Sequence, residues 1–457
     1  MICTMRPTGR RLLPDPYSPT HGNSSITVSA YDLTLDYDVG PNRLRGLAVL
    51  SGIVRGDTTE KNGLGVLSLD LFSPLKVEEI ELRSGDGAPV TVSSFRQRRG
   101  KLDIVPGWKL AGGQEFQLSI RYRGKPRPVD GLWGDVGWEE LTDGVLVAGQ
   151  PNGAPSWFPC NDLVSDKARY RFSVSVEAGY RVVCNGVLTS RERRDARETW
   201  VFEQSEPMST YLAAVHIGRY EHLDLPGDVP QSVAVPRALA GQAQAALARQ
   251  DEMMRLFTAR FGPYPFGRYT VVIADDPLEI PLEAQSVSVF GRNHLTAGAG
   301  NESLVAHELA HQWFGNSVTA GGWCDIWLHE GFATYAEWLW AEAGGGSIGR
   351  RAREEFAWLR QQRQDLSLAD PGPAAMFDDR VYRRGALALH SLRCSAGDNL
   401  FFSLLQEWTR KYRHGCAGTR DFLDLADKAY APAGVSASDL LAPWLYEQAV
   451  PAARFGP

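Results

Sequence analysis

The sequence predicts an α+β protein with more than one domain, in which an antiparallel β domain precedes a mostly helical domain. Its 457 residues exceed what one hydrophobic core usually serves. From residue 25 to about 220, apolar and polar positions alternate in short runs, the period of half-buried strands. After residue 223 the composition favours helices. We therefore expect a flexible N-terminal tail over residues 1–24, a β domain over 25–222 and a second domain over 223–457.

Short alternating runs indicate the strands of the first domain, and turn residues separate them. Gly85-Asp86-Gly87 and Asn185-Gly186 are two such turns. The predicted strands are 25–37, 66–71, 116–122, 170–177, 180–187 and 199–203.

In the second domain, residues 237–261 are rich in Ala, Leu, Gln and Arg and predict one long helix, which Gly262-Pro263 ends. Residues 270–274 read as a buried strand. Further helices are predicted at 303–314, 328–343, 351–364, 380–394, 397–412, 419–430 and 436–447.

Charge and composition argue against several classes of protein. The formal net charge is -6, whereas nucleic-acid binding needs a concentrated basic face. The residues before Asn23 contain no apolar signal core, and no apolar run is long enough to span a membrane. The six cysteines are scattered without a C-x-x-C pair, which favours reduced thiols. We expect a cytoplasmic protein without nucleic-acid or membrane partners, and the oligomeric state stays open.

The segment 305–319 carries the most informative motif, His307-Glu308-x-x-His311. On a helix, residues four apart share a face, so both imidazoles can reach one zinc ion. Glu308 projects about 100° around the helix from His307. That offset places its carboxylate beside the open position of the metal, where it can act as a general base.

A catalytic zinc site usually has three protein ligands. Eighteen residues separate His311 from Glu330, which lies in a second predicted helix. Glu337 is two helical turns further on and faces the same way, so it can accept a hydrogen bond from the second nitrogen of a ligand imidazole. His329 points about 100° away from Glu330, and we interpret it as a structural or exposed histidine.

Together these motifs resemble the M1 family of zinc aminopeptidases, the group of aminopeptidase N and leukotriene A4 hydrolase. The family signature H-E-x-x-H-x18-E, followed by E-G-F-A, stands here as 307–311 and 330–333. Residues 150–168, 261–266 and 381–385 are similar to other family segments. The resemblance covers about residues 25–450. It implies a saddle-like β domain, a thermolysin-like catalytic domain and one Zn²⁺ per chain.

The resemblance also implies further site residues. Tyr382 corresponds to the catalytic tyrosine, which donates a hydrogen bond to the oxyanion. Glu283, with Gln150 and Asn152, corresponds to the residues that hold the substrate amine. Here the family's G-x-M-E-N motif reads Ile-Pro-Leu-Glu-Ala at 280–284, and Pro281 lacks the N–H of an edge strand.

Two more departures from the family pattern affect the expected site. Many members carry Glu where this chain has Asn152, so one acidic contact to the amine is neutral. The chain also ends soon after the catalytic domain, without the family's large helical C-terminal domain, so we expect a more open site.

The predicted function is zinc-dependent removal of the N-terminal residue from peptides with a free amine, with Glu308 as the general base for a zinc-activated water. The alternatives are a zinc endopeptidase of the same fold, an epoxide hydrolase similar to leukotriene A4 hydrolase, and a non-catalytic scaffold. The complete set of ligands and catalytic groups argues against the scaffold.

Overall fold

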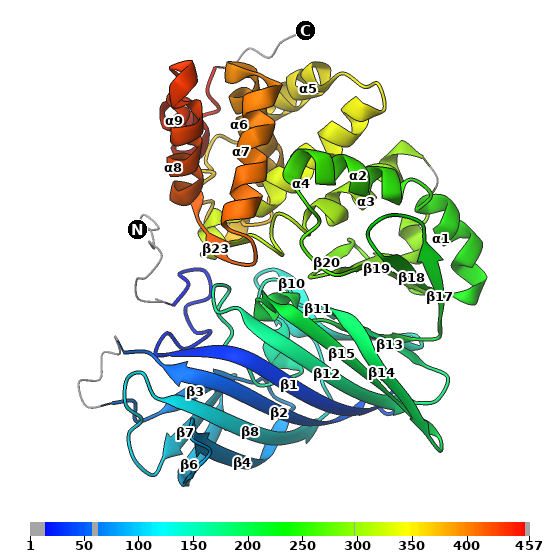
Figure 1. The fold of residues 1–457 in the computed structure, drawn as a ribbon, viewed down its shortest axis with the longest axis vertical. Coiled ribbons are helices and arrows are strands. Elements are labelled where there is room, and N and C mark those ends of the chain that lie inside the picture. The colour runs from blue at the N-terminus through cyan, green and yellow to red at the C-terminus, as the bar shows by residue number, and fades with distance from the viewer. Residues whose placement is uncertain (1–13, 57–62, 297, 453–457) are drawn as a thin grey trace.

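The computed structural model describes residues 14–56, 63–296 and 298–452. They form a β-rich half, at the bottom of Figure 1, and a mostly helical half, at the top. The predicted order, a β domain followed by a mostly helical domain, is confirmed.

An eight-stranded sheet dominates the first half of the described chain. Its spatial order is β14-β15-β12-β1-β2-β8-β4-β5. Buried and exposed positions alternate along β1 and β2, which leaves one face of the sheet for the core. The bounds are β1 (Ile26–Asp38), β2 (Arg43–Val54), β4 (Lys76–Ser84), β5 (Pro89–Val90), β8 (Glu115–Gly124), β12 (Ala168–Glu177), β14 (Val187–Arg194) and β15 (Arg197–Met208).

The prediction of a purely antiparallel domain is wrong at one pair of strands. β1 and β12 run parallel, with Tyr31 opposite Tyr170. A parallel pair requires a long connection, and the rest of the domain supplies it between these two strands.

Two smaller sheets complete this half. One has the order β13-β16-β11-β10-β9 and the other the order β3-β7-β6. Trp138, Trp157 and Phe158 are fully buried, and the Trp157 ring contacts the other two. The bounds are β3 (Leu67–Asp70), β6 (Val92–Arg98), β7 (Lys101–Pro106), β9 (Val129–Gly131), β10 (Gly134–Leu141), β11 (Gly144–Ala148), β13 (Arg181–Cys184) and β16 (Val215–Gly218).

The second half begins with a five-stranded sheet in the order β17-β18-β19-β21-β20. β18, β19 and β21 are parallel neighbours, whereas β20 is an antiparallel edge strand. β17 spans residues 220–225 and therefore crosses the predicted domain boundary at 222/223, which stays a prediction. The bounds are β17 (Tyr220–Leu225), β18 (Gln231–Pro236), β19 (Tyr269–Ala274), β20 (Leu282–Ala284) and β21 (Val287–Gly291).

Helices make up most of the remaining described chain, and a short pair, β22 (Thr319–Ala320) and β23 (Cys416–Ala417), lies among them. The helices are α1 (Ala240–Ala246), α2 (Gln250–Phe261), α3 (Ala299–Ala310), α4 (Trp327–Ala343), α5 (Ile348–Gln361), α6 (Asp379–Ala396), α7 (Asp398–Lys411), α8 (Thr419–Tyr430) and α9 (Ala437–Tyr446). None of them is long and apolar enough to cross a membrane.

The prediction of one helix over 237–261 is wrong, because the chain breaks between α1 and α2. Leu247 and Arg249 leave the helical conformation. Arg249 stacks its guanidinium on Trp340 and pairs with Glu302, so tertiary contacts outweigh the helix propensity there.

The segment 14–24, which we expected within a flexible tail, packs against both halves instead. Tyr17 is buried and donates its hydroxyl to Asp370, while the same oxygen accepts from the Gly372 N–H at 2.7 Å. Asp15 accepts from the Trp323 N–H at 2.8 Å. The expectation for residues 1–13 lies outside the described residues.

Four of the described cysteines, Cys160, Cys184, Cys394 and Cys416, are thiols, as expected. Cys324 is disulfide-bonded, which corrects the expectation for that residue.

The β-rich half also holds the turn that follows α3. Lys167 is half-buried, and its Nζ donates to the carbonyls of Asn316 and Ser317 at 3.0 and 2.9 Å. Tyr211 donates to the carbonyl of Gly315 at 3.1 Å. Burial lowers the pKa of Lys167 to about 8, and the two carbonyls satisfy its ammonium. The end of α3 is therefore anchored on the neighbouring domain.

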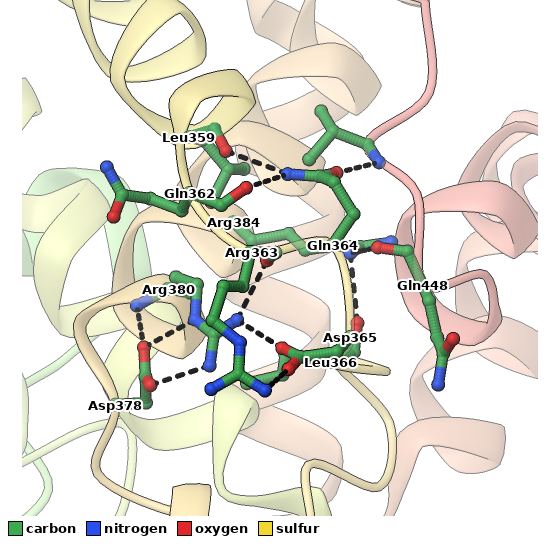
Figure 2. Close-up of polar contacts among 11 residues, drawn as sticks. Leu359, Gln362, Arg363, Gln364, Asp365, Leu366, Asp378, Arg380, Arg384 and Gln448 are labelled. Carbon is green, nitrogen blue, oxygen red and sulfur yellow. Dashed lines mark hydrogen bonds and ion pairs between the residues drawn. The ribbon is translucent and has the colours of Figure 1, made fainter.

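The C-terminal part of the described chain is tied to α6 through Arg384 (Figure 2). Arg384 is fully buried and donates to the carbonyls of Leu366 and Gln448 at 3.1 and 2.9 Å. It also donates to the Trp444 carbonyl at 2.7 Å. Leu366 precedes α6 in the chain, Trp444 lies in α9 and Gln448 follows α9, so one guanidinium connects α6 to both of these segments.

Candidate metal centre and active site

α3 presents His307 and His311 on one face, with ring centroids 4.8 Å apart. Each ring is oriented through its Nδ1 atom. Nδ1 of His307 lies 2.7 Å from Oε1 of Glu337, and Nδ1 of His311 lies 3.1 Å from the carbonyl oxygen of Phe314. Both partners are acceptors, so each Nδ1 carries the proton and each Nε2 offers a lone pair.

Glu330, in the first turn of α4, faces both of these lone pairs. Its Oε2 lies 3.4 Å from Nε2 of His307 and 3.5 Å from Nε2 of His311. Ligand atoms about 2.0–2.1 Å from a tetrahedral zinc ion lie about 3.3–3.4 Å apart. The spacing therefore fits one zinc ion. Among the described residues, these three side chains form a group with ligand atoms within 4.8 Å of one another.

A second group of this kind consists of Glu283, Glu308 and His311. Both groups contain His311, so the second group lies directly beside the first. Glu283, Glu308 and Glu330 therefore concentrate negative charge around the two imidazoles. This negative charge favours the binding of a metal cation and of a second cationic group, and it disfavours the binding of anions.

Glu337 connects the metal group to α3 through a second contact. Its Oε2 accepts a hydrogen bond from the Ser303 hydroxyl, one turn before His307 on α3. The carboxylate is thus held at both oxygens and orients the His307 ring. No motif in the sequence marks Ser303, although its spacing of four residues from His307 places it on the same face.

Glu308 is 5% exposed and lies beside this group without belonging to the His307–His311–Glu330 set. Its Oε2 has no hydrogen-bond partner among the described residues. Burial raises the pKa of Glu308 to about 7; the charge of His307 lowers it, and those of Glu330 and Glu337 raise it. A dication in the neighbouring group would lower it again. The carboxylate is available to take up a proton.

Tyr382 reaches the site because α4 and α6 cross at two glycines. A Cβ on Gly331 would meet Cα of Gly385 at 2.8 Å, and a Cβ on Gly385 would meet Cα of Gly331 at 2.7 Å. This close approach brings the Tyr382 ring onto the His307 ring, with centroids 6.1 Å apart and planes 19° apart. Burial, and then the charges of Glu330, Glu283 and Glu308, raise the pKa of Tyr382. The phenol remains a hydrogen-bond donor.

Glu283 lies on the edge strand β20 despite the altered motif around it. Pro281 precedes the strand, and Glu283 pairs with Ser288 of β21. Two residues after the histidine motif anchor this edge: the side chains of Gln312 and Asn316 both donate to the carbonyl of Ala284, at 3.1 and 3.0 Å. Neither anchor could be recognised in the sequence, because an amide after a metal motif has no distinctive spacing.

Burial raises the pKa of Glu283 well above its ordinary value, and repulsion from Glu330 and Glu308 adds to this effect. A positive charge beside Glu283 would relieve that repulsion.

Gln150 and Asn152 lie in a tight turn that packs on Tyr211. The Gly153 N–H donates to the Gly149 carbonyl at 2.8 Å, and a Cβ on Gly149 would meet the Tyr211 carbonyl oxygen at 2.1 Å. Nε2 of Gln150 is buried without a hydrogen-bond partner among the described residues. Nδ2 of Asn152 lies 3.4 Å from Nε2 of His21. We did not single out His21, because its segment carries no motif.

His329 lies apart from the metal group. It is buried, and its Nε2 accepts a hydrogen bond from the Ala320 N–H at 2.8 Å. Burial lowers its pKa to about 3, as for a neutral structural histidine.

Comparisons with known proteins agree with this geometry. The Peptidase M1 N-terminal domain matches residues 28–212, and the Peptidase family M1 domain matches residues 245–444. The chain is 25% identical to the leucyl aminopeptidase of Saccharolobus solfataricus, over 94% of this chain and 54% of that protein. It spans about half the length of the curated relatives it matches.

Solved structures of M1 zinc metallopeptidase from Deinococcus radiodurans superpose over almost the whole chain. One is 28% identical with a TM-score of 0.85, covering 96% of this chain and 98% of that one. Another, with the same identity and TM-score, is a mutant bound to a Tyr-Ser-Ala substrate. Both family models match the chain, three of its side chains are spaced to bind zinc, and its fold agrees with that of solved M1 structures. The chain therefore belongs to peptidase family M1.

Proposed function

We propose that this protein is a zinc-dependent aminopeptidase that removes the N-terminal residue from peptides. The observation that carries the proposal is the position of Glu283, whose carboxylate belongs to one group of atoms with Glu308 and His311. A substrate ammonium paired with Glu283 would lie a fixed, short distance from the metal group. Only the first peptide bond can then reach the reacting groups.

His307, His311 and Glu330 would hold the zinc ion, and Glu337 would orient His307. When bound, zinc supplies a Lewis acid that lowers the pKa of water and polarises a carbonyl group.

Glu308 acts as the general base and then as the general acid. Its buried, unpartnered Oε2 can take a proton from the attacking water and hand it to the leaving amine. The Tyr382 phenol, kept protonated by burial and by the surrounding carboxylates, can donate a hydrogen bond to the oxygen on which negative charge develops.

Glu283, Gln150 and Asn152 form the amine pocket. Glu283 supplies the negative charge, and the two amides supply neutral oxygens. The solved structure of a relative bound to a Tyr-Ser-Ala substrate supports peptide substrates.

The proposal is tested by hydrolysis of one tripeptide with and without an N-acetyl group, with and without a metal chelator. The zinc-loaded wild type should cleave only the free peptide, and the chelator should abolish cleavage. Glu283→Gln should raise KM for the free peptide by roughly ten- to a hundredfold, because the negative charge that strengthens the hydrogen bond to the ammonium is lost.

Glu279→Gln is the matched control, since Glu279 is an exposed carboxylate just before the same edge strand. It should leave KM unchanged. Comparable cleavage of the acetylated and free peptides by the wild type would instead support an endopeptidase, and no cleavage of either would support a scaffold.

A further inference from the structure

Asn152 contacts a histidine from a distant part of the chain. Its Nδ2 lies 3.4 Å from Nε2 of His21, and Nδ1 of the same ring lies 2.8 Å from Oδ2 of Asp162. The other oxygen of Asp162 accepts from the Thr210 hydroxyl at 2.7 Å. Asp162, His21 and Asn152 therefore form a line of hydrogen bonds, hereafter the Asp162–His21–Asn152 relay.

The position of His21 is well defined. The Gly22 N–H donates to Oδ2 of Asp70 at 2.7 Å, and Lys101 bridges Oδ1 of Asp70 and the Gly22 carbonyl at 2.6 and 3.0 Å. Gly22 has φ +69°, and a Cβ there would meet the Leu163 side chain at 2.2 Å. The His21 side chain is only 12% exposed. This segment is built to hold the ring in one place.

The relay lies next to the candidate site. Thr210, which holds Asp162, begins a short 3-10 helix (Thr210–Leu212) that contacts β20, the strand of Glu283. The next residue, Tyr211, lies close enough to Glu283 and Glu330 for their charges to raise its pKa, although burial has the larger effect. The turn of Gln150 and Asn152 packs on the same tyrosine. Both ends of the relay are therefore linked to Tyr211, the neighbour of Glu283.

The donors and acceptors of the relay determine the orientation of the Asn152 amide. A carboxylate only accepts, so Nδ1 of His21 carries a proton. Nε2 of the neutral ring then accepts from the Asn152 NH₂ group, which leaves the Asn152 oxygen for another donor. A protonated ring has a donor at both nitrogens, and its Nε2–H requires the Asn152 oxygen instead.

We propose that His21 is a positioning residue: the neutral ring turns the Asn152 oxygen toward the substrate ammonium, and its protonation reverses the amide. This inference rests on the proposed amine pocket. In the reversed state an NH₂ group faces the ammonium, so binding of the amine weakens at low pH.

The charged groups around His21 favour its protonated form. Burial lowers the pKa of His21, but the hydrogen bond and charge of Asp162 and the charge of Asp70 outweigh it, while Lys101 lowers it. The net result is a raised pKa. The relay should therefore be reversed below about pH 6, where a ring with a raised pKa is protonated, and it should become intact as pH rises through that pKa.

The test measures binding to the zinc-loaded enzyme by calorimetry, with L-leucine and with isocaproate, the same carboxylate without its amine. The ratio of their affinities reports the amine pocket alone, because both share every other group. Neither ligand has a bond that the enzyme can hydrolyse, and the amine of a free amino acid stays charged throughout the acidic and neutral range. In the wild type the preference for leucine should fall about tenfold toward the acidic end, the size of one hydrogen bond to a charged group.

His21→Gln keeps a side chain of similar length that cannot acquire a charge, so its preference should not change with pH. Asn152→Asp keeps a carboxylate oxygen for the amine whichever form His21 takes, so its preference should persist at low pH even if His21→Gln fails to fold. A wild-type pH dependence retained in either variant overturns the role of His21. A pH-independent preference in the wild type also overturns it and leaves the aminopeptidase proposal standing, whereas no preference at any pH overturns both.

Discussion

Replacing Glu337 by glutamine should weaken zinc binding while leaving the fold intact. Oε1 of Glu337 lies 2.7 Å from Nδ1 of His307, and its Oε2 accepts from Ser303. Glutamine keeps an acceptor for His307 and a donor for the serine oxygen, so only the negative charge is lost. Partners of this kind typically change metal affinity by about 10- to 100-fold. We expect about tenfold for Glu337→Gln, or about 1.4 kcal/mol.

Glu337→Ala removes the acceptor as well and leaves the His307 N–H without its partner. We expect about a hundredfold loss for this variant, or about 2.7 kcal/mol.

The measurement is a competition titration of the protein against a chromophoric zinc chelator. Glu342→Gln is the matched control, because Glu342 lies on the same helix but pairs with Arg393 at 2.9 Å instead. An affinity of Glu337→Gln within about twofold of the wild type would exclude this role of the Glu337 charge, and so would an equal loss in the control.

Three further outcomes are expected. Glu308→Gln should keep its zinc and lose roughly 10²–10⁴-fold in kcat, because the general base is gone; loss of the metal would make Glu308 a ligand instead. Tyr382→Phe should lower kcat by roughly 10²–10³-fold with little change in KM, since the bond forms in the transition state; a change confined to KM would contradict this. Burial raises the pKa of Asp166 to about 7, so its stabilising contribution is complete below the unfolded pKa of about 3.9 and is lost as pH rises through about 7. Urea unfolding of Asp166→Asn should therefore depend less on pH than that of the wild type, by roughly 2–4 kcal/mol across this range, and an unchanged dependence would exclude Asp166 as its source.

Local patterns in the sequence predicted what depends on neighbouring residues. Helical spacing placed His307 and His311 on one face, and the structure has their rings 4.8 Å apart. The same spacing predicted that Glu330 and Glu337 face one way, and both carboxylates contact His307. Several of the strands and most helices were predicted for the same reason, because periodicity is a local property.

The predictions were wrong where contacts between residues far apart in the sequence determine the local structure. The break between α1 and α2 follows from the contacts of Arg249 with Trp340 and Glu302, which no window of sequence contains. The parallel pairing of β1 with β12, and the packing of Tyr17 against Asp370, likewise join residues far apart in the chain.

The sequence alone therefore determined the two-part fold and a zinc-binding motif, because hydrophobic period and ligand spacing are written along the chain. The tertiary structure decided how the rest of the site comes together. Gly331 and Gly385 let two helices approach closely enough for Tyr382 to reach His307, and two amides after the motif anchor the edge strand of Glu283. The contact of His21 with Asn152 also exists only in three dimensions, because its geometry depends on the packing of segments 131 residues apart.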